Sequence, residues 1–397
     1  EVGLGGEVRQ VSHLERRPVE AQRLGFTRAV LPESGPPGPP NMEVVRVRTL
    51  ADAVEAVGLC HSDVAQLAGH KHVPGEVCPV VPGHEIVGRV HALAEDADLG
   101  VGVGDRVAVD IVWYGPPRDG NPFGVRCYGY SFGLDEGAGL WGGYGEYMAV
   151  LPGTHLARLT DDLSAAELTL FEPLSNMVAW LGQAGFQAGQ TVVIQGPGHM
   201  GLTCAAYAKR LGAAQVIVTG TAEDASRLAV ALEVGADHAI DVTVDDPVEA
   251  VMDLTDGFGA SLAVDLASAP GTPDLCFDMV HHRATVIWAG MKDRKAVPVV
   301  TDKVVMKGLR VMGGAGGDAA SVDEAARILN EGGFLTAPLQ GAVVGLDEID
   351  RAMALRHREG AADAVRAVLR HVHLSTIHNA RGRRYAVCSV RRLLHHN

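Results

Sequence analysis

The 397-residue sequence has few aromatic residues and no long apolar run. Aromatic residues make up 5% of the chain, against 47% apolar residues and 49 glycines. This composition is typical of an α/β protein and argues against a disordered chain. No stretch reaches the roughly 18 consecutive apolar residues that a transmembrane helix requires. Residues 1–17 are charged and lack the apolar core of a signal peptide. We therefore expect a soluble, cytoplasmic protein with no membrane partner.

Basic residues and paired cysteines are also scarce. The chain has 34 Lys and Arg against 48 Asp and Glu, a formal net charge of −14. This balance argues against broad binding of nucleic acid, which needs cationic surface to neutralise phosphates. Cys204 and Cys276 lie in helix-like apolar patterns, so we expect both to be buried as small hydrophobic residues. The six cysteines are scattered without a disulfide framework, which predicts reduced thiols and a cytosolic location.

The first part of the chain is punctuated by the Pro- and Gly-rich segment 34–40. Before it we predict a helix over 14–25 and a strand over 28–31. After it we predict a strand over 43–47 and a helix over 50–57. From Cys60 to about Val150, short apolar runs such as 86–91 and 106–111 alternate with Gly and Pro. This texture predicts an irregular β-rich domain.

From about Asn176, strand-like and helix-like runs alternate. Such alternation predicts a parallel sheet covered by helices on both faces. The expected strands are 191–195, 215–219, 238–241, 261–267 and 285–289, and the expected helices are 199–211, 224–234, 247–254 and 274–282.

A glycine motif lies between the first of these strands and its helix. Gly196, Gly198 and Gly201 form G-x-G-x-x-G in the strand–turn–helix context that makes the motif specific for dinucleotides. Gly196 permits the tight turn, Gly198 lets the backbone approach a pyrophosphate, and Gly201 lets helix and strand pack closely. His199 and Met200 open the helix, whose N-terminus attracts phosphate. We count both among the cofactor-binding residues.

The second strand of this region ends without the expected acid. Gly220 and Thr221 follow it, so no carboxylate is present to hold the ribose 2′-hydroxyl or to repel a 2′-phosphate. Arg227 could reach such a phosphate, but Glu223 and Asp224 stand nearby and would oppose it. The choice between NAD and NADP therefore stays open at this stage.

Four residues on three separate segments of the sequence form a candidate set of metal ligands: Cys60, His84, Glu85 and Glu172. A thiolate, an imidazole and carboxylates are typical zinc ligands, and catalytic zinc takes three protein ligands with a fourth position open. A metal beside a hydride carrier suggests interconversion of alcohols and carbonyl compounds.

At these motifs the sequence resembles the medium-chain zinc-dependent alcohol dehydrogenases, including their polyol branch of sorbitol and glucose dehydrogenases. The matching segments are 58–63, 82–88, 103–107, 142–147, 172–175 and 196–201. The resemblance runs from about Gly58 to His371. It implies a GroES-like, β-rich catalytic domain over 59–175 and 311–370, and a Rossmann domain with a doubly wound parallel sheet over 176–310.

The resemblance also implies roles for individual residues. Cys60, His84 and Glu172 would be the zinc ligands, and Glu85 a carboxylate behind the metal that can exchange onto it. Asp63 would orient a ligating imidazole. Ser62 would take the substrate proton, and His61 would touch the cofactor pyrophosphate.

Two departures from the family pattern change what we expect. Many relatives have four closely spaced cysteines for a structural zinc, but the stretch 110–144 holds only Cys127, so we predict one catalytic zinc and no structural zinc. Ala65 stands where some relatives place a relay histidine, so the proton must leave through water, the ribose or another route.

The expected partners are a small alcohol or carbonyl substrate and, by resemblance, further copies of the chain in a dimer or tetramer. A zinc-free NADPH-dependent reductase of the same superfamily is the alternative.

Both ends of the chain look foreign to such an enzyme. Residues 1–58 resemble the C-terminal Lon-protease-like domain of bacterial RadA-type DNA-repair proteins, without a Walker A motif, and we expect the usual first strands of the catalytic domain to be missing. Residues 371–397 contain five Arg and five His but no Asp or Glu, a basic tail that resembles neither family. These ends suggest a gene fusion, an assembly artefact or a recombinant join. A catalytically impaired fusion protein with a non-enzymatic DNA-repair-like segment is a further alternative.

Overall fold

The computed structural model describes residues 19, 22, 28–32, 39–40, 43–47, 53–69, 73, 75–93, 99–117, 123–137, 139–356 and 365–370. The chain divides into two compact units. The first comprises Glu1–Thr169, Val344–Ile349 and Leu369–Asn397, and the second comprises Leu170–Val343 and Asp350–Val368. Most of the predicted helix 14–25, most of the segment 34–40 and the basic tail 371–397 lie outside the described residues.

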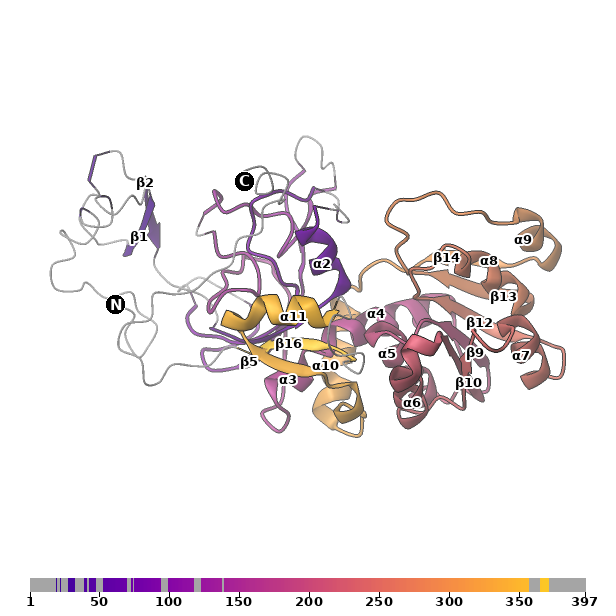
Figure 1. Cartoon of the computed structure of the whole chain (residues 1–397). Coiled ribbons are helices and arrows are strands. Elements are labelled where there is room, and N and C mark those ends of the chain that lie inside the picture. The colour runs from indigo at the N-terminus through magenta and orange to yellow at the C-terminus, as the bar shows by residue number, and fades with distance from the viewer. Residues whose placement is uncertain are drawn as a thin grey trace. The chain divides into compact units, whose positions relative to one another are not determined.

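The first unit is built on a β-sheet with the strand order β15-β16-β3-β4-β5-β8. Neighbouring strands from β3 to β8 are antiparallel. Two smaller pairs accompany this sheet, β1 with β2 in parallel and β6 with β7 in antiparallel orientation. Short helices connect the strands, and Figure 1 shows α2 beside this β-rich part. The bounds are β1 (Arg28–Pro32), β2 (Glu43–Val47), β3 (Ala53–Leu59), α2 (His61–Leu67), β4 (Glu85–Arg89), β5 (Arg106–Val109), β6 (Val112–Tyr114), β7 (Val125–Cys127), β8 (Leu156–Arg158), α3 (Ala165–Leu168), β15 (Ala342–Gly345), η3 (Leu346–Glu348) and β16 (Ala367–Arg370).

The predicted helix over 50–57 is wrong, because Ala53–Leu59 forms strand β3. A short apolar run fits a buried strand as well as a helix, and its pattern alone does not decide between them. Here the decision comes from a distant segment: Val54 pairs with Gly88 of β4, and Val57 pairs with Ile86. The strand predictions over 28–31 and 43–47 are confirmed by β1 and β2.

The second unit contains a parallel sheet with the order β11-β10-β9-β12-β13-β14. Figure 1 shows helices on both sides of these strands. The predicted architecture, a β-rich domain together with a parallel sheet covered by helices on both faces, is confirmed. The bounds are α4 (Phe171–Ala184), β9 (Thr191–Gln195), α5 (His199–Arg210), β10 (Gln215–Gly220), η1 (Ala222–Asp224), α6 (Ala225–Glu233), β11 (His238–Asp241), α7 (Pro247–Leu254), β12 (Ala260–Asp265), α8 (Thr272–Asp278), β13 (Val280–Trp288), α9 (Thr301–Lys307), β14 (Arg310–Gly313), α10 (Ala319–Glu331), η2 (Ala337–Leu339) and α11 (Ile349–Arg356).

The elements of this unit follow local signals in the sequence. Asp246 caps α7 by accepting from the backbone N–H groups of Val248 and Glu249 at 2.8 and 3.1 Å, which satisfies donors that a helix start leaves unpaired. Gly185 ends α4 with a φ of 71°, a conformation that favours glycine. The predicted helix 274–282 is too long, because α8 ends at Asp278 and β13 begins at Val280.

The core of the second unit is apolar, as a parallel sheet covered on both faces requires. Val193, Ile217, Val264, Phe277 and Val286 are at most 1% exposed. Cys204 and Cys276 are fully buried, as predicted, and burial raises the pKa of the Cys204 thiol to about 12. No helix in the described part of the chain is long and apolar enough to cross a membrane.

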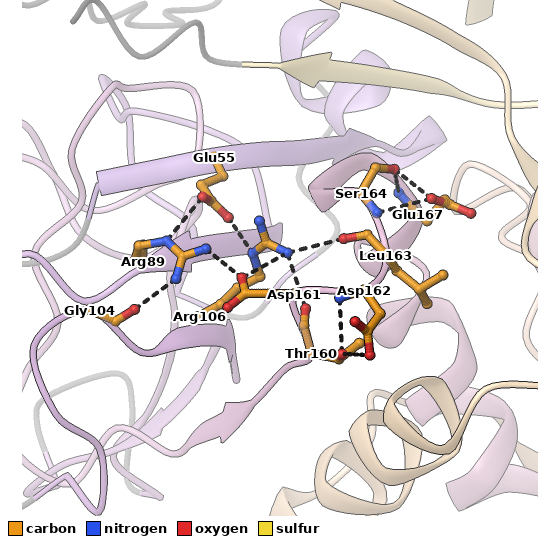
Figure 2. A network of polar contacts seen from close by, with 10 residues as sticks. All are labelled: Glu55, Arg89, Gly104, Arg106, Thr160, Asp161, Asp162, Leu163, Ser164 and Glu167. Carbon is orange, nitrogen blue, oxygen red and sulfur yellow. Dashed lines mark hydrogen bonds and ion pairs between the residues drawn. The ribbon is translucent and has the colours of Figure 1, made fainter.

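An ion-pair network ties three strands of the first unit to the segment after β8. Figure 2 shows Glu55 of β3 between the guanidinium groups of Arg89 and Arg106. The distances to Glu55 are 3.3 Å from Arg89 Nε and 2.6 Å from Arg106 Nε. Arg106 also donates to the carbonyl oxygens of Thr160 and Leu163. The Glu55 and Arg106 side chains are only 12% exposed, whereas the second carboxylate near Arg106, that of Asp161, is 70% exposed. Glu55 is therefore the buried partner of Arg106 that water does not replace.

The substitution Glu55→Gln should lower the free energy of unfolding by about 2–4 kcal/mol, since it removes the nearest carboxylate of the buried Arg106 and leaves it only the exposed Asp161 at 3.3 Å. The matched control is Glu324→Gln on α10, where Glu324 pairs with Arg327 and the two side chains are 35% and 50% exposed. That pair should contribute less than about 1 kcal/mol because it is screened by solvent. Denaturant unfolding of both variants measures the difference, and equal losses would contradict the assignment.

Candidate metal and dinucleotide sites

Cys60 lies at the start of helix α2, where its backbone is held by Asp63. The Cys60 N–H donates to Asp63 Oδ2 at 2.9 Å. Asp63 is 2% exposed and so needs hydrogen-bond partners to be stable inside the protein. Its other oxygen, Oδ1, lies 3.1 Å from His84 Nδ1. One buried carboxylate therefore connects the backbone of one predicted zinc ligand to the imidazole of another.

His84 is buried, with only 5% of its surface exposed. Burial acts to lower the pKa of His84, but the charges of Tyr130 and Asp63, together with hydrogen bonds to Asp63 and Cys60, outweigh it and raise the pKa well above its usual value. Cys60 is among the side chains that raise this pKa, so the thiol and the imidazole are neighbours, as two ligands of one metal ion would be. Ser62 Oγ lies 3.4 Å from His84 Nε2. The structure thus brings Cys60, Ser62, Asp63 and His84 together within the first unit.

The turn that delivers His84 requires glycine at Gly83. Its φ is +94°, and a Cβ there would lie 2.6 Å from the Tyr144 ring. The segment Gly143–Tyr144 braces this turn, because the Gly143 and Tyr144 N–H groups donate to the carbonyl oxygens of Gly83 and Pro82 at 3.0 and 2.9 Å. Close backbone approach of this kind is the physical reason for the Pro-Gly-His-Glu motif.

Glu85, the first residue of β4, is fully buried. A buried carboxylate is costly unless it is paired or coordinates a metal. Tyr144 is also fully buried, and burial, followed by the charges of Asp63 and Glu85, raises its pKa well above the usual value. His61 is exposed at the first position of α2. All these residues belong to the first unit.

The remaining predicted zinc ligand, Glu172, belongs to the second unit. It is the second residue of α4 and half-buried. Asn176, one turn later, donates from Nδ2 to Glu172 Oε1 at 2.9 Å. The amide oxygen of Asn176 accepts from the Gly317 N–H at 2.9 Å. Asn176 therefore fixes one carboxylate oxygen of Glu172 against the loop before α10.

The glycine motif follows β9 and opens α5. Gly196 has a φ of +100°, and a Cβ there would approach the Ala267 backbone nitrogen to 3.0 Å. A Cβ on Gly201 would lie 1.9 Å from the Gly196 carbonyl oxygen, so only glycine fits. Gly198, at the N-terminus of α5, faces open space, with nothing within 4 Å of its added Cβ. His199 and Met200 are the first two helical residues, and His199 is 4% exposed.

The end of β10 is organised by Asp224. Its Oδ2 accepts from the Thr221 N–H and hydroxyl at 3.1 and 2.9 Å, and its Oδ1 lies 3.5 Å from Arg227 Nη1. Arg227 is only 8% exposed. Gly220 packs against Pro197 of the glycine loop, where a Cβ would come within 2.8 Å. Thr221, Asp224 and Arg227 thus form one contact group beside Gly220.

A buried ion pair that no sequence motif indicated lies at the carboxyl ends of β12 and β13. Lys292 Nζ is 2.9 Å from Asp265 Oδ2 and also donates to Thr272 Oγ1 at 3.1 Å. Burial raises the pKa of Asp265, although Lys292 acts to lower it. This edge of an open parallel sheet is where ligands bind in such folds. The position of Lys292 just after the carboxyl end of a predicted strand is the signal in the sequence that could have identified it.

No sequence motif indicated a role for Tyr130 either. Its hydroxyl donates to Ser62 Oγ at 3.0 Å and lies 3.0 Å from His84 Nδ1. Burial raises the pKa of Tyr130 well above its usual value. Tyr130 lies in the turn after β7, outside every matching segment and 46 and 68 residues from His84 and Ser62, so only the tertiary structure reveals it.

Comparison with known proteins identifies the family. A model described as the alcohol dehydrogenase GroES-like domain matches residues 52–161, and one described as zinc-binding dehydrogenase matches residues 200–331. The chain therefore belongs to the zinc-binding alcohol dehydrogenase family, as its motifs predicted.

The chain is similar to several individual members of this family. The chain is 37% identical over 322 residues to a Mycobacterium tuberculosis protein described as an alcohol dehydrogenase, covering 76% of this chain and 85% of that protein. It is 30% identical over 287 residues to a sorbitol dehydrogenase of Halalkalibacterium halodurans, covering 70% and 79%. The fold is similar to that of a protein from Sinorhizobium meliloti described as a zinc-binding dehydrogenase bound to NADP. For that pair the TM-score is 0.69 and the identity 22%, with 81% of this chain and 91% of that chain covered.

The contrast between Gly201 and Gly198 gives a test of the glycine loop. Gly201→Ala should lower the free energy of unfolding by about 3 kcal/mol, because the new methyl group overlaps the Gly196 carbonyl oxygen. Gly198→Ala should cost less than about 1 kcal/mol, since its φ of −70° suits alanine and the space around it is open. Thermal and denaturant unfolding of the two variants provide the measurement. Equal losses would show that the loop does not pack as described.

Proposed function

We propose that this protein transfers a hydride between an alcohol or polyol and NAD(P), with one zinc ion held by Cys60, His84 and Glu172. The observation that carries the proposal is the Cys60–Asp63–His84 arrangement. It places a thiol beside an imidazole whose Nδ1 faces a buried carboxylate. Metal-bound histidines characteristically donate their second ring N–H to such a carboxylate. The donor types fit zinc, and membership of the family supports the same reading.

Each residue of the proposed site would have a distinct role. Zinc bound there would polarise the alcohol or carbonyl oxygen, and the nicotinamide would carry the hydride. Asp63 would keep the proton of His84 on Nδ1 and so leave Nε2 for the metal. Ser62, whose hydroxyl lies on the Nε2 side of His84, would accept the substrate proton. The open space at Gly198 would receive the pyrophosphate, with His61, His199, Met200, Gly220 and Thr221 nearby along the cofactor.

Metal analysis of purified protein tests the zinc assignment. We expect about one zinc per chain in the native protein, as in a catalytic site without a structural one. Cys60→Ala should abolish both zinc content and alcohol-dependent NAD(P)H formation in a screen of alcohols and polyols. The matched control is Cys127→Ala, whose half-buried thiol is not a proposed ligand. A Cys60→Ala protein with full zinc and near-normal turnover would refute the proposal.

The same measurement separates the two candidate third ligands. Glu172→Gln should release the metal, whereas Glu85→Gln should retain it at lower affinity, since Glu85 is proposed only as an exchanging carboxylate. Turnover that survives removal of all zinc by a chelator would favour the zinc-free NADPH-dependent reductase instead.

For the cofactor we propose NAD rather than NADP. The NADP 2′-phosphate would need a cation, but Arg227 is buried and faces Asp224. Moving Arg227 outward would leave Asp224 buried with one partner fewer. Glu223, which is exposed next to Thr221, would repel the phosphate.

With NAD, kcat/KM should exceed that with NADP by about tenfold or more, the scale on which a missing favourable contact discriminates between substrates. Initial rates with both cofactors at equal concentrations measure this ratio. Arg227→Gln should destabilise the protein and leave the ratio unchanged. A selective loss of NADP turnover in that variant would show that Arg227 contacts the phosphate after all.

The foreign character of the chain ends stays a prediction. The family match begins at residue 52, and β3 pairs with β4 from Ala53 onward. The proposed join between the RadA-like segment and the enzyme therefore lies before or within β3, and resequencing the codons for residues 47–62 tests it.

We also propose that the protein forms a dimer or a tetramer, which measurement of its mass in solution tests.

A further inference from the structure

The hydroxyl of Tyr130 lies between two residues of the proposed metal site. It is 3.0 Å from Ser62 Oγ and 3.0 Å from His84 Nδ1. Tyr130 is 3% exposed, so water does not compete strongly for these contacts. None of the family motifs in the sequence contains this residue. The proposed roles of Ser62 and His84 account for neither contact.

The hydrogen-bond directions around Tyr130 follow from the donors available. Asp63 Oδ1 can only accept, so the proton of His84 resides on Nδ1, which faces it at 3.1 Å. The phenol oxygen then accepts from the same Nδ1–H, and the phenol O–H donates to Ser62 Oγ. The chain of contacts runs from His84 through Tyr130 to Ser62. A metal ion on Nε2 would take the place of any proton there, and the Ser62 proton is directed away from Tyr130, toward the Nε2 side of His84.

The protein holds Tyr130 firmly in this place. The Gly129 carbonyl accepts from Gln66 Nε2 of α2 at 3.0 Å, and the Tyr130 carbonyl accepts from the Val77 N–H at 3.0 Å. Gly129 has a φ of +81°, and a Cβ on it would come within 2.8 Å of the Gly83 carbonyl oxygen. The Tyr130 turn is therefore packed against the residue that precedes His84. The rings of Tyr130 and His84 also pack against each other, with centroids 5.3 Å apart.

We propose that Tyr130 is a positioning residue for the dehydrogenase reaction. It fixes the Ser62 hydroxyl and the His84 ring together, so that Nε2 faces the metal while Ser62 presents its oxygen to the substrate. This inference rests on the proposed function, since it assigns Tyr130 a task at the same site. The residue acts through Ser62 and His84 and does not itself touch the substrate or the metal.

Tyr130→Phe tests the proposal, because it removes the hydroxyl and keeps the buried ring. We expect kcat to fall about tenfold or more and zinc affinity to fall by a similar factor, the scale found when the hydrogen-bond partners of a metal ligand are removed. The KM for the dinucleotide should not change. Zinc affinity is measured by competition with a chromophoric chelator, independently of turnover, and alcohol oxidation gives kcat and KM.

Tyr128→Phe is the matched control. Tyr128 lies in the same turn and is fully buried, but its hydroxyl contacts Thr154 Oγ1 and the Leu151 N–H, both at 2.7 Å. Its loss should lower stability while leaving kcat and zinc affinity near those of the native protein. Equal effects of the two variants on zinc affinity would overturn the proposal, since they would indicate a general loosening of the turn.

A double-substitution cycle with Ser62→Ala gives a second readout. If Tyr130 acts on catalysis through Ser62, Tyr130→Phe should lower kcat much less in the Ser62→Ala background than in the native one. Full additivity of the two effects, or native kcat and zinc affinity in Tyr130→Phe, would overturn the inference. A native protein that neither binds zinc nor oxidises alcohols would instead overturn the proposed function, and this inference with it.

Discussion

The buried carboxylate of Asp63 is the interaction on which the proposed metal site depends. Its two oxygens do different work, one holding the Cys60 backbone and the other the His84 imidazole. A buried carboxylate with two good partners is stable, whereas one with a missing partner is strongly unfavourable. The same requirement that keeps Asp63 paired therefore keeps the thiol and imidazole near each other. The ligand geometry is a consequence of satisfying a buried charge before any metal is considered.

The second unit uses close backbone contacts for an analogous purpose. The peptide at Leu266–Ala267 lies against both Gly196 and Gly290, where an added Cβ would meet Ala267 atoms at 3.0 and 2.2 Å. Lys292 also binds the Ala267 carbonyl oxygen and the buried Asp265. The glycine loop and the loop after β13 thus both pack against the same peptide, Leu266–Ala267. Such rigidity at the carboxyl ends of the strands suits a site that must orient a flexible dinucleotide.

The sequence predicted the second unit well because its signals are local. The strand 191–195, the strand 238–241 and the helix 247–254 have the bounds predicted for them, since periodicity, caps and proline act over a few residues. The helix predicted over 50–57 failed because its conformation is decided by pairing with β4 about thirty residues away. Cys60, His84 and Asp63 were recognised from motifs. Tyr130 and the Asp265–Lys292 pair were not, because their roles come from contacts over tens of residues that leave no local pattern.

The segment between Asp110 and Tyr144 shows how such contacts can replace a sequence signal. In its described part, Arg126 lies 3.7 Å above the Phe132 ring and binds Glu136 with an N–O distance of 2.6 Å. Phe132 in turn stacks on Tyr128 at 5.0 Å. A desolvated guanidinium over an aromatic face is a substantial attraction, and Arg126 is 7% exposed. These cross-links give the segment a folded core from arginine and aromatic side chains. The turn that carries Tyr130 belongs to this segment.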